Sequence, residues 1–204
     1  MTSNNHKRVQ KLTECALMLA LSAALSFTEI IKMPMGGGVT LLSMLPVMLI
    51  SVRYGVGTGL CEAFAFSLFN LLQGLLSGNV FVFCEGAAAV VTVVLFDYIL
   101  PFSLLGLCGL SLKIKRNAPC AVAGIFVCIL FRFVCHYVTG VVIWGQWAED
   151  MSVYLYSLVY NGSYLLPEAV LTCAGAAAAL KVPQIKKLTG LTEKKNTEEE
   201  SDKK

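Results

Sequence analysis

Charged side chains are scarce in this chain. Asp, Glu, Lys and Arg make up 14% of its 204 residues and 56% are hydrophobic, whereas about 25% of an average soluble domain is charged. This composition places the chain among integral membrane proteins rather than soluble domains. The net charge of +3 therefore bears on membrane topology and is no sign of nucleic-acid binding.

Two kinds of motif are also missing. The sequence has no GxxxxGK[ST] loop for ATP phosphates, so energy for uphill transport would have to come from another protein. It has eight cysteines but no CxxC pair, which argues against both a metal site and a disulfide framework. A buried cysteine in a helix is usually a small apolar side chain, and we expect no metal and no cofactor.

Six apolar stretches fill most of the chain. They run from Leu12 to Ile31, Val39 to Val52, Val56 to Leu76, Gly86 to Leu112, Ala118 to Ile143 and Val153 to Leu180. A helix needs about 20 apolar residues to cross a bilayer, and backbone in lipid must satisfy its own hydrogen bonds. We therefore predict an all-α integral membrane protein with six transmembrane helices, although Pro46 interrupts the short second stretch.

Basic residues gather at alternate ends of these stretches. They precede the first, separate the second from the third and the fourth from the fifth, and follow the sixth, whereas the other loops hold only Lys32. By the positive-inside rule, both termini are cytoplasmic. The predicted division is a cytoplasmic segment 1–11, a membrane domain 12–182 and a charged tail 183–204, whose composition favours disorder. The long first apolar run argues against a cleaved signal peptide.

Three ionisable residues lie within the apolar stretches at mid-helix positions. Asp97 is in the fourth, and Arg132 and His136 are in the fifth. Residues Arg132, His136, Gly140 and Trp144 are four apart, so they share one slowly winding helix face about 18 Å long. Intramembrane ionisable residues usually mark functional sites. The set predicts a pocket wall, but an Asp97–Arg132 ion pair, helix packing at Gly140 and an interfacial Trp144 are alternatives.

The last apolar stretch adds polar groups at its outer half. Tyr156 and Asn161 lie five residues apart, and an amide that both donates and accepts suits a heteroaromatic ring. Pro167 predicts a kink, and Glu168 is a second buried acid with no assigned role. Together with the stripe, these residues predict a site for a small, flat, cationic ligand that enters from outside.

Small residues recur in the first apolar stretch. Ala16 and Ala20 are four apart, with Ala24 one step further. Such spacing lets another helix approach closely. The partner could be a helix of this chain or of a second protein.

Four segments resemble the thiamine-specific substrate-binding subunits, or S components, of energy-coupling factor transporters. They are MPMGGGVTLLSMLPVMLISVRYGVGTGL, LFDYILPFSLLGLCGL, RFVCHYVTGVVIWGQWA and YSLVYNGSY. The likeness covers roughly residues 8 to 185, and the last two segments are the most specific because they combine uncommon residues at fixed spacing. The resemblance implies a six-helix fold with an outward-facing thiamine site.

The resemblance also implies roles for residues of the fourth and fifth stretches. Asp97 would complement the cationic ligand, Tyr98 would contact its hydroxyethyl end, and Arg132 falls where the family has a basic residue. His136 and Trp144 would pack on the rings of thiamine.

The remaining implied contacts come from three positions. Gly140 would leave room for the ligand, and Tyr156 and Asn161 would form hydrogen bonds with it. Ala16 and Ala20 match an AxxxA motif that docks S components on a transmembrane coupling subunit, which works with two ATPases.

The chain departs from the family pattern at two places. Some members carry Glu at the position of Asp97, and some carry Trp in the first outer loop, where this chain has KMPMGGG. The sulfur side chains of that loop could cover the ligand. The possible lid comprises Met33, Met35, Gly36 and Gly37.

Three other functions remain open on the sequence. One is an S component for a different vitamin or for a precursor such as the pyrimidine half of thiamine. Another is a self-sufficient solute carrier or small channel. The third is an intramembrane enzyme using Cys135 and His136, but adjacent helical residues point about 100° apart, which is poor geometry for a nucleophile and its base.

Overall fold

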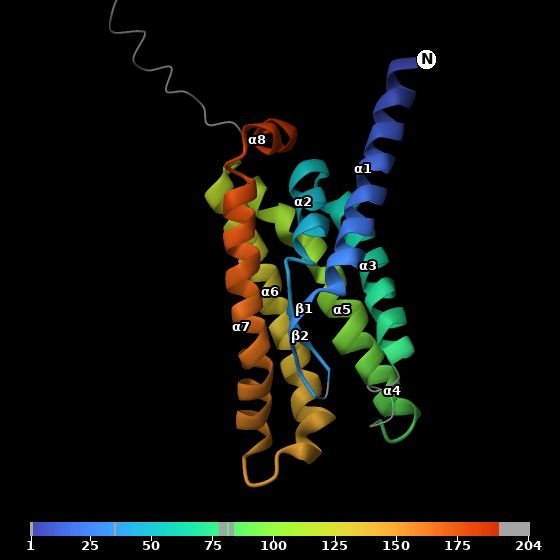
Figure 1. Cartoon of the computed structure of the whole chain (residues 1–204), viewed down its shortest axis with the longest axis vertical. Coiled ribbons are helices and arrows are strands. Elements are labelled where there is room, and N and C mark those ends of the chain that lie inside the picture. The colour runs from blue at the N-terminus through green and yellow to red at the C-terminus, as the bar shows by residue number, and fades with distance from the viewer. Residues whose placement is uncertain (1, 35, 78–80, 82–83, 192–204) are drawn as a thin grey trace, which may run out of the picture.

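The computed structural model describes residues 2–34, 36–77, 81 and 84–191. Helices dominate it, and the longest ones run roughly along the long axis of the molecule (Figure 1). These are α1 (Thr2–Ser26), α3 (Val56–Ser77), α6 (Ala118–Val142) and α7 (Val153–Ala179). The predicted helical membrane protein is confirmed in that sense.

The fourth apolar stretch forms a helix of irregular backbone. It begins as α4 (Ala87–Val93), widens into a π-helix (Val94–Ile99), returns to α-helix in α5 (Leu100–Ser103) and tightens into a 3-10 helix (Leu104–Lys113). Within the described residues, four helices are long and apolar enough to cross a membrane. A fifth is counted if α7 and α8 (Pro183–Thr189), which meet at a 94° bend, form one span.

The prediction for the first two stretches is wrong where they meet. Helix α1 ends at Ser26, and a β-hairpin follows, in which β1 (Glu29–Lys32) pairs antiparallel with β2 (Gly38–Thr40). The turn contains Gly36 and Gly37, with φ of 96° and 80°, a conformation that other residues rarely adopt. Helix α2 (Leu45–Tyr54) starts only after this hairpin and at 10 residues is too short to cross a bilayer alone.

The prediction of a disordered tail from residue 183 is also wrong at its start. Pro183 opens α8 at a position where proline is well tolerated, and Gly190, with φ of 66°, ends it. Arg116 donates to the Thr189 carbonyl oxygen at 3.1 Å, and Leu191 is buried in the main core. Residues 192–204 lie outside the described part of the chain.

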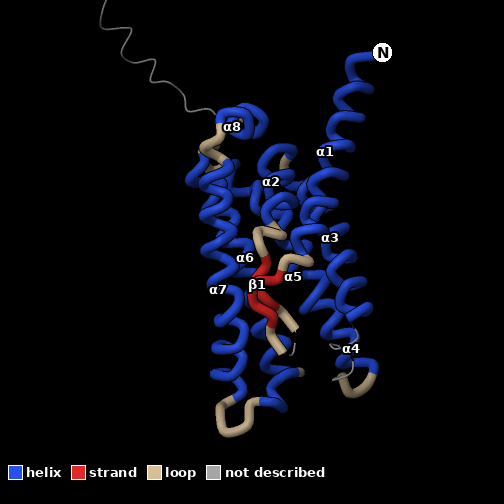
Figure 2. The backbone as a smooth tube through the Cα atoms, in the orientation of Figure 1, coloured by secondary structure: helices blue, strands red, loops and turns tan. Residues whose placement is uncertain are grey.

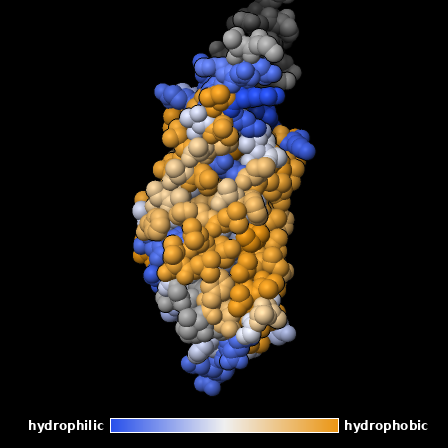
Figure 3. Space-filling model, turned by 90° about the vertical axis from the view of Figure 1, so that its right-hand side faces the viewer, coloured by the Kyte–Doolittle hydropathy of each residue, from blue (hydrophilic) through white to orange (hydrophobic). Residues whose placement is uncertain are grey.

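The main core lies among α2, α3, α6 and the irregular helix, with Met44, Met48, Phe66 and Leu105 at its centre. On the face that Figure 3 shows, the middle of the molecule is mainly hydrophobic and both ends are hydrophilic. This is the surface expected of a protein that spans a lipid bilayer.

The arrangement of the elements creates an interior space. The start of α1 and α8 lie at one end of the molecule, whereas α4 and the turn between α6 and α7 lie at the other (Figure 1). The hairpin runs through the middle, in front of α6 and beside α7 (Figure 2). The space bounded by the hairpin, α3, the irregular helix, α6 and α7 holds the predicted site.

Candidate ligand-binding site

A cavity of about 410 Å³ lies between the hairpin and the helices. Every predicted ligand contact lines it, from three separate stretches of the chain: Asp97, Tyr98, Arg132, His136, Gly140, Trp144, Tyr156 and Asn161. The predicted lid residues Met33, Gly36 and Gly37 line it as well, while Met35 falls outside the described residues. The fold therefore brings together residues that were grouped from sequence spacing and from the family resemblance.

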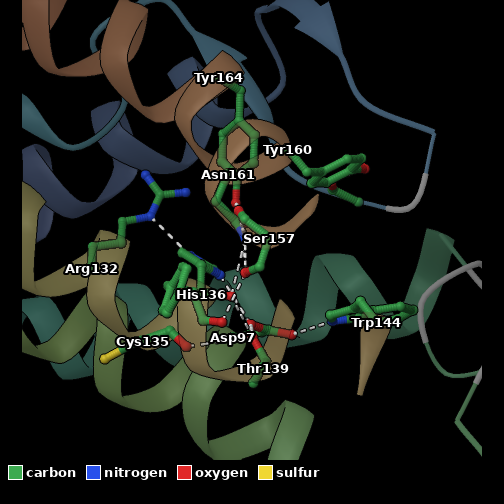
Figure 4. Close-up of polar contacts among 12 residues, drawn as sticks. Asp97, Arg132, Cys135, His136, Thr139, Trp144, Ser157, Tyr160, Asn161 and Tyr164 are labelled. Carbon is green, nitrogen blue, oxygen red and sulfur yellow. Dashed lines mark hydrogen bonds and ion pairs between the residues drawn. The ribbon is translucent and has the colours of Figure 1, made fainter. Parts of the chain in front are cut away.

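Asp97 is the centre of the polar network in this cavity (Figure 4). Its Oδ1 lies 3.0 Å from His136 Nδ1 and accepts a hydrogen bond from Thr139 Oγ1. Its Oδ2 accepts a bond from Trp144 Nε1 at 3.1 Å. All three partners belong to the end of α6 or the short helical turn after it, so this end of α6 holds the carboxylate in one orientation.

The backbone at Asp97 explains how the carboxylate reaches its partners. Asp97 sits inside the π-helix Val94–Ile99, and a π turn holds one residue more than an α turn, which is why such segments recur at functional sites. Apolar periodicity gives no sign of this irregularity, and neither does it reveal Thr139. That residue is three positions after His136 on the same helix face, which is the signal that could have identified it.

Arg132 does not pair with Asp97. Its Nη1 lies 3.5 Å from Glu168 Oε2 on α7 and 3.0 Å from Met44 Sδ, and its guanidinium stacks over the Phe102 ring at 4.5 Å. The predicted alternative of an Asp97–Arg132 ion pair is thus wrong, and Glu168, which had no assigned role, is the counterion of Arg132.

A second hydrogen bond of Arg132 determines the state of His136. Arg132 Nε donates to His136 Nε2 at 3.3 Å, so Nε2 must carry the lone pair and the ring proton is on Nδ1. That proton is the one directed at Asp97 Oδ1. His136 is therefore a neutral imidazole in this arrangement, and it links the guanidinium to the carboxylate.

The α6–α7 contact accounts for Gly140 and Asn161. A Cβ built on Gly140 would collide with Ser157 Oγ and lie 2.9 Å from Asn161 Nδ2, so the room that this glycine provides is filled by α7. Asn161 Nδ2 donates to the Ser157 carbonyl oxygen at 3.0 Å and to that of His136 at 3.2 Å. The contacts of Gly140 thus agree with the alternative that this glycine serves helix packing.

The hairpin contacts α7 both at its tip and at its base. Tyr160 donates from its hydroxyl to the Gly36 carbonyl oxygen at 3.1 Å, and Gly37 lies flat against the Tyr164 ring, where a Cβ would come within 2.8 Å. At the base of the hairpin, Thr40 Oγ1 donates to Glu168 Oε1 at 2.7 Å. These contacts hold the hairpin over the cavity.

Two further tyrosines complete the walls. Tyr98 stacks on Phe81 with ring centroids 6.1 Å apart, and its hydroxyl rests against Gly74 of α3. Tyr156 stacks on Tyr160 at 5.8 Å. Aromatic faces and one carboxylate are the groups that bind a flat organic cation in water-excluded sites.

A helical membrane protein with an interior cavity, lined by aromatic rings and a largely buried acid, belongs to the class of proteins that bind a small solute within the bilayer. The chain belongs to the family described as "Thiamine transporter protein", whose model matches residues 12–188. The resemblance inferred from the sequence is thereby confirmed, and the chain is a multi-pass membrane protein of a bacterial kind.

Individual relatives agree with this assignment. The chain is 32% identical to the thiamine transporter ThiT of Bacillus subtilis over 187 residues, which cover 84% of this chain and 90% of that protein. It is 27% identical to ThiT of Lacticaseibacillus paracasei over 198 residues, covering 88% and 92%. A solved structure of ThiT from Listeria monocytogenes superimposes with a TM-score of 0.67 at 25% identity, over 90% of this chain and 98% of that one.

Proposed function

We propose that this protein captures thiamine from outside the cell as the S component of an energy-coupling factor transporter. The observation that carries the proposal is the Asp97 carboxylate, largely buried and held by three donors inside a cavity walled by aromatic rings. Thiamine consists of two flat aromatic rings joined by a methylene bridge, and its thiazolium ring carries a permanent positive charge. A buried carboxylate beside aromatic faces matches both properties.

Different side chains of the cavity contact different parts of the ligand. Asp97 compensates the charge, and the rings of His136 and Trp144 provide flat surfaces on either side of the carboxylate. Tyr156 and Asn161 on α7 contribute polar groups to the edge of the ligand, and Tyr98 does so from the opposite wall. The protein binds and releases thiamine unchanged, so its role is not catalytic and needs no cofactor.

Entry of the ligand requires the hairpin to move. Met33, Gly36 and Gly37 lie at its tip, and this tip contacts Tyr160 and Tyr164 of α7. Breaking these few contacts opens the cavity toward the outer side. The hairpin therefore acts as a lid.

The proposed topology has six membrane crossings with both termini in the cytoplasm. Helix α2 is too short alone, so it completes its crossing together with the hairpin that precedes it. Residues 1–11 and the segment after α8 then lie on the cytoplasmic side, where the basic residues gather.

The energy for transport comes from partner subunits. Ala16 and Ala20 are exposed on α1, whose other face is fixed by an ion pair of 2.7 Å between Glu14 and Arg53 of α2. Small exposed residues four apart let a helix of the transmembrane coupling subunit approach closely. That subunit works with two ATPases, which accounts for a transporter subunit without an ATP-binding loop of its own.

Thiamine binding to the purified protein tests the proposal. The sequence has two tryptophans, Trp144 and Trp147, and the first lies in the cavity, so we expect thiamine to quench its fluorescence and calorimetry to give a matching affinity. Tight binding of the pyrimidine half but not of thiamine would instead favour a precursor-binding S component. Uptake into liposomes by the protein alone would favour a self-sufficient carrier.

A further inference from the structure

The charges buried around the cavity do not balance. Among the described residues that line it, one guanidinium, Arg132, faces two carboxylates, Asp97 and Glu168. Lys32 and Glu29 also line the cavity but pair with each other at 3.9 Å, where the lysine is largely exposed. Since His136 is neutral, as its hydrogen bonds require, one uncompensated negative charge remains.

The location of this charge depends on Glu168. Its side chain is almost completely buried, and it lies on the side of Arg132 away from the imidazole, with Oε2 3.5 Å from Arg132 Nη1. Asp97 is on the other side of that imidazole. Glu168 therefore neutralises Arg132 on the side away from His136, and the negative charge of Asp97 remains available to a ligand.

We propose that Glu168 is a positioning residue that determines the preference of the cavity for a cation. Without Glu168, the positive charge of Arg132 would have no counterion and would be separated from Asp97 only by the His136 ring. It would then offset the attraction of the Asp97 carboxylate for a cation. This inference rests on the proposed function, because thiamine is the cation concerned.

Glu168 has a second attachment that fits this role. Its other oxygen, Oε1, accepts the 2.7 Å hydrogen bond from Thr40 at the end of β2, and Thr40 also lies 2.6 Å from Ser43. Met44, next in the chain, contacts the Arg132 guanidinium. The base of the lid thus contacts the Arg132–Glu168 ion pair. Glu168 therefore compensates the charge of Arg132 when the lid is in place.

The test compares a charged with an uncharged ligand. In Glu168→Gln, we expect thiamine affinity to fall by about 10- to 100-fold, the effect of one unit charge at roughly 6–10 Å with an effective dielectric constant near 20. Affinity for 3-deazathiamine, the same shape without the ring charge, should change by less than about 3-fold. Loss of packing alone would weaken both ligands equally.

A double variant separates charge from architecture. Arg132→Gln combined with Glu168→Gln restores one net negative charge, so thiamine affinity should recover above that of Glu168→Gln, although two native side chains are gone. Glu168→Asp should retain the preference for the charged ligand, and Glu149→Gln, an exposed acid in the α6–α7 turn, is the matched control. The double variant also serves if the buried arginine keeps Glu168→Gln from folding.

Different binding results would contradict the role of Glu168 and the proposed function. Equal losses for the two ligands in Glu168→Gln, or a double variant that binds thiamine more weakly than Glu168→Gln does, would overturn the inference while leaving thiamine binding by the wild type intact. Folded wild-type protein that binds no thiamine would overturn the proposed function, and the inference with it.

Discussion

At the scale of single residues, the site is organised around a carboxylate that accepts three hydrogen bonds and still lines the cavity. Asp97 accepts from an imidazole, a hydroxyl and an indole, so its orientation is established before any ligand arrives. Pre-oriented charges lose little freedom on binding, which favours affinity. A ligand must then compete with, or pack against, groups that are already well placed.

Replacing Asp97 with Asn tests the importance of its charge. We expect the dissociation constant for thiamine to rise by about 30- to 1,000-fold, because hydrogen bonds and contacts to a charged group are worth about 2–4 kcal/mol at such sites. Calorimetry on purified protein gives the value, and thermal unfolding shows whether the fold is retained. Wild-type affinity in Asp97→Asn would rule out this carboxylate as the ligand's counterion.

Gly140 should respond to substitution through stability. Gly140→Ala places a methyl group against Ser157 Oγ, and overpacking of this kind costs about 1–3 kcal/mol, so we expect a lower melting temperature in detergent. Adding Ser157→Ala removes the obstructing oxygen and should recover part of the loss. Gly162→Ala, whose Cβ would meet nothing closer than 3.9 Å, is the control and should not destabilise the protein.

The spacing of residues in the sequence predicted which side chains line the site better than it predicted which of them pair with one another. The four-residue stripe from Arg132 to Trp144 identified one wall of the cavity, because helix geometry alone puts such residues on one face. Thr40 and Glu168 were beyond reach, since they are 128 positions apart and no local pattern pairs them. For the same reason the sequence could not identify Glu168 as the partner of Arg132, and the alternative of an Asp97–Arg132 ion pair is wrong.

At the scale of elements, the hairpin and α7 form the closure of the cavity. Tyr160 holds the tip and Glu168 the base, both from α7. The structure differs from the sequence prediction most in this region, because Glu29–Lys32 is apolar enough to extend a helix but pairs with β2 instead. Strand pairing is a non-local event, so a short apolar run does not reveal it.

Removing one contact of the lid should speed ligand release. Tyr160→Phe loses the hydrogen bond to Gly36, worth about 0.5–1.5 kcal/mol, so the dissociation rate of thiamine should rise by about 2- to 10-fold while the association rate changes little. Stopped-flow tryptophan fluorescence measures both rates. Tyr154→Phe, on the exposed side of the same helix, is the control, and an equal change in both variants would contradict a lid role for Tyr160.

At the scale of the whole molecule, the exposed apolar surface continues over α1, where Leu12, Leu17 and Leu21 are exposed beside Ala16 and Ala20. These five residues do not line the cavity, although Ser26 at the end of the same helix does. We therefore expect that the proposed ligand capture and the proposed partner docking can be separated by mutation.

Bulky side chains on α1 test that separation. Ala16→Trp with Ala20→Trp should abolish thiamine uptake by the complete transporter in proteoliposomes, because two indoles prevent close helix approach. Binding to the purified subunit should remain within about 3-fold of the wild type, since ordinary surface substitutions change free energies by about 0.5 kcal/mol. Loss of both activities together would show that α1 serves the cavity as well.

The irregular helix that carries Asp97 reconciles two contacts that a regular helix could not make together. Upstream of the π turn's end, Asp97 faces α6; downstream, Gly106 lies against Gly59 of α3 so closely that a Cβ would meet backbone atoms at 2.5 Å. Deleting one residue within 94–99 would turn the part of the helix after the deletion by about 100° relative to the part before it. The extra residue therefore sets the angle between the side of the helix that carries Asp97 and the side that packs on α3. Substitutions on the α3 side can then occur without rotating the acid out of the binding site.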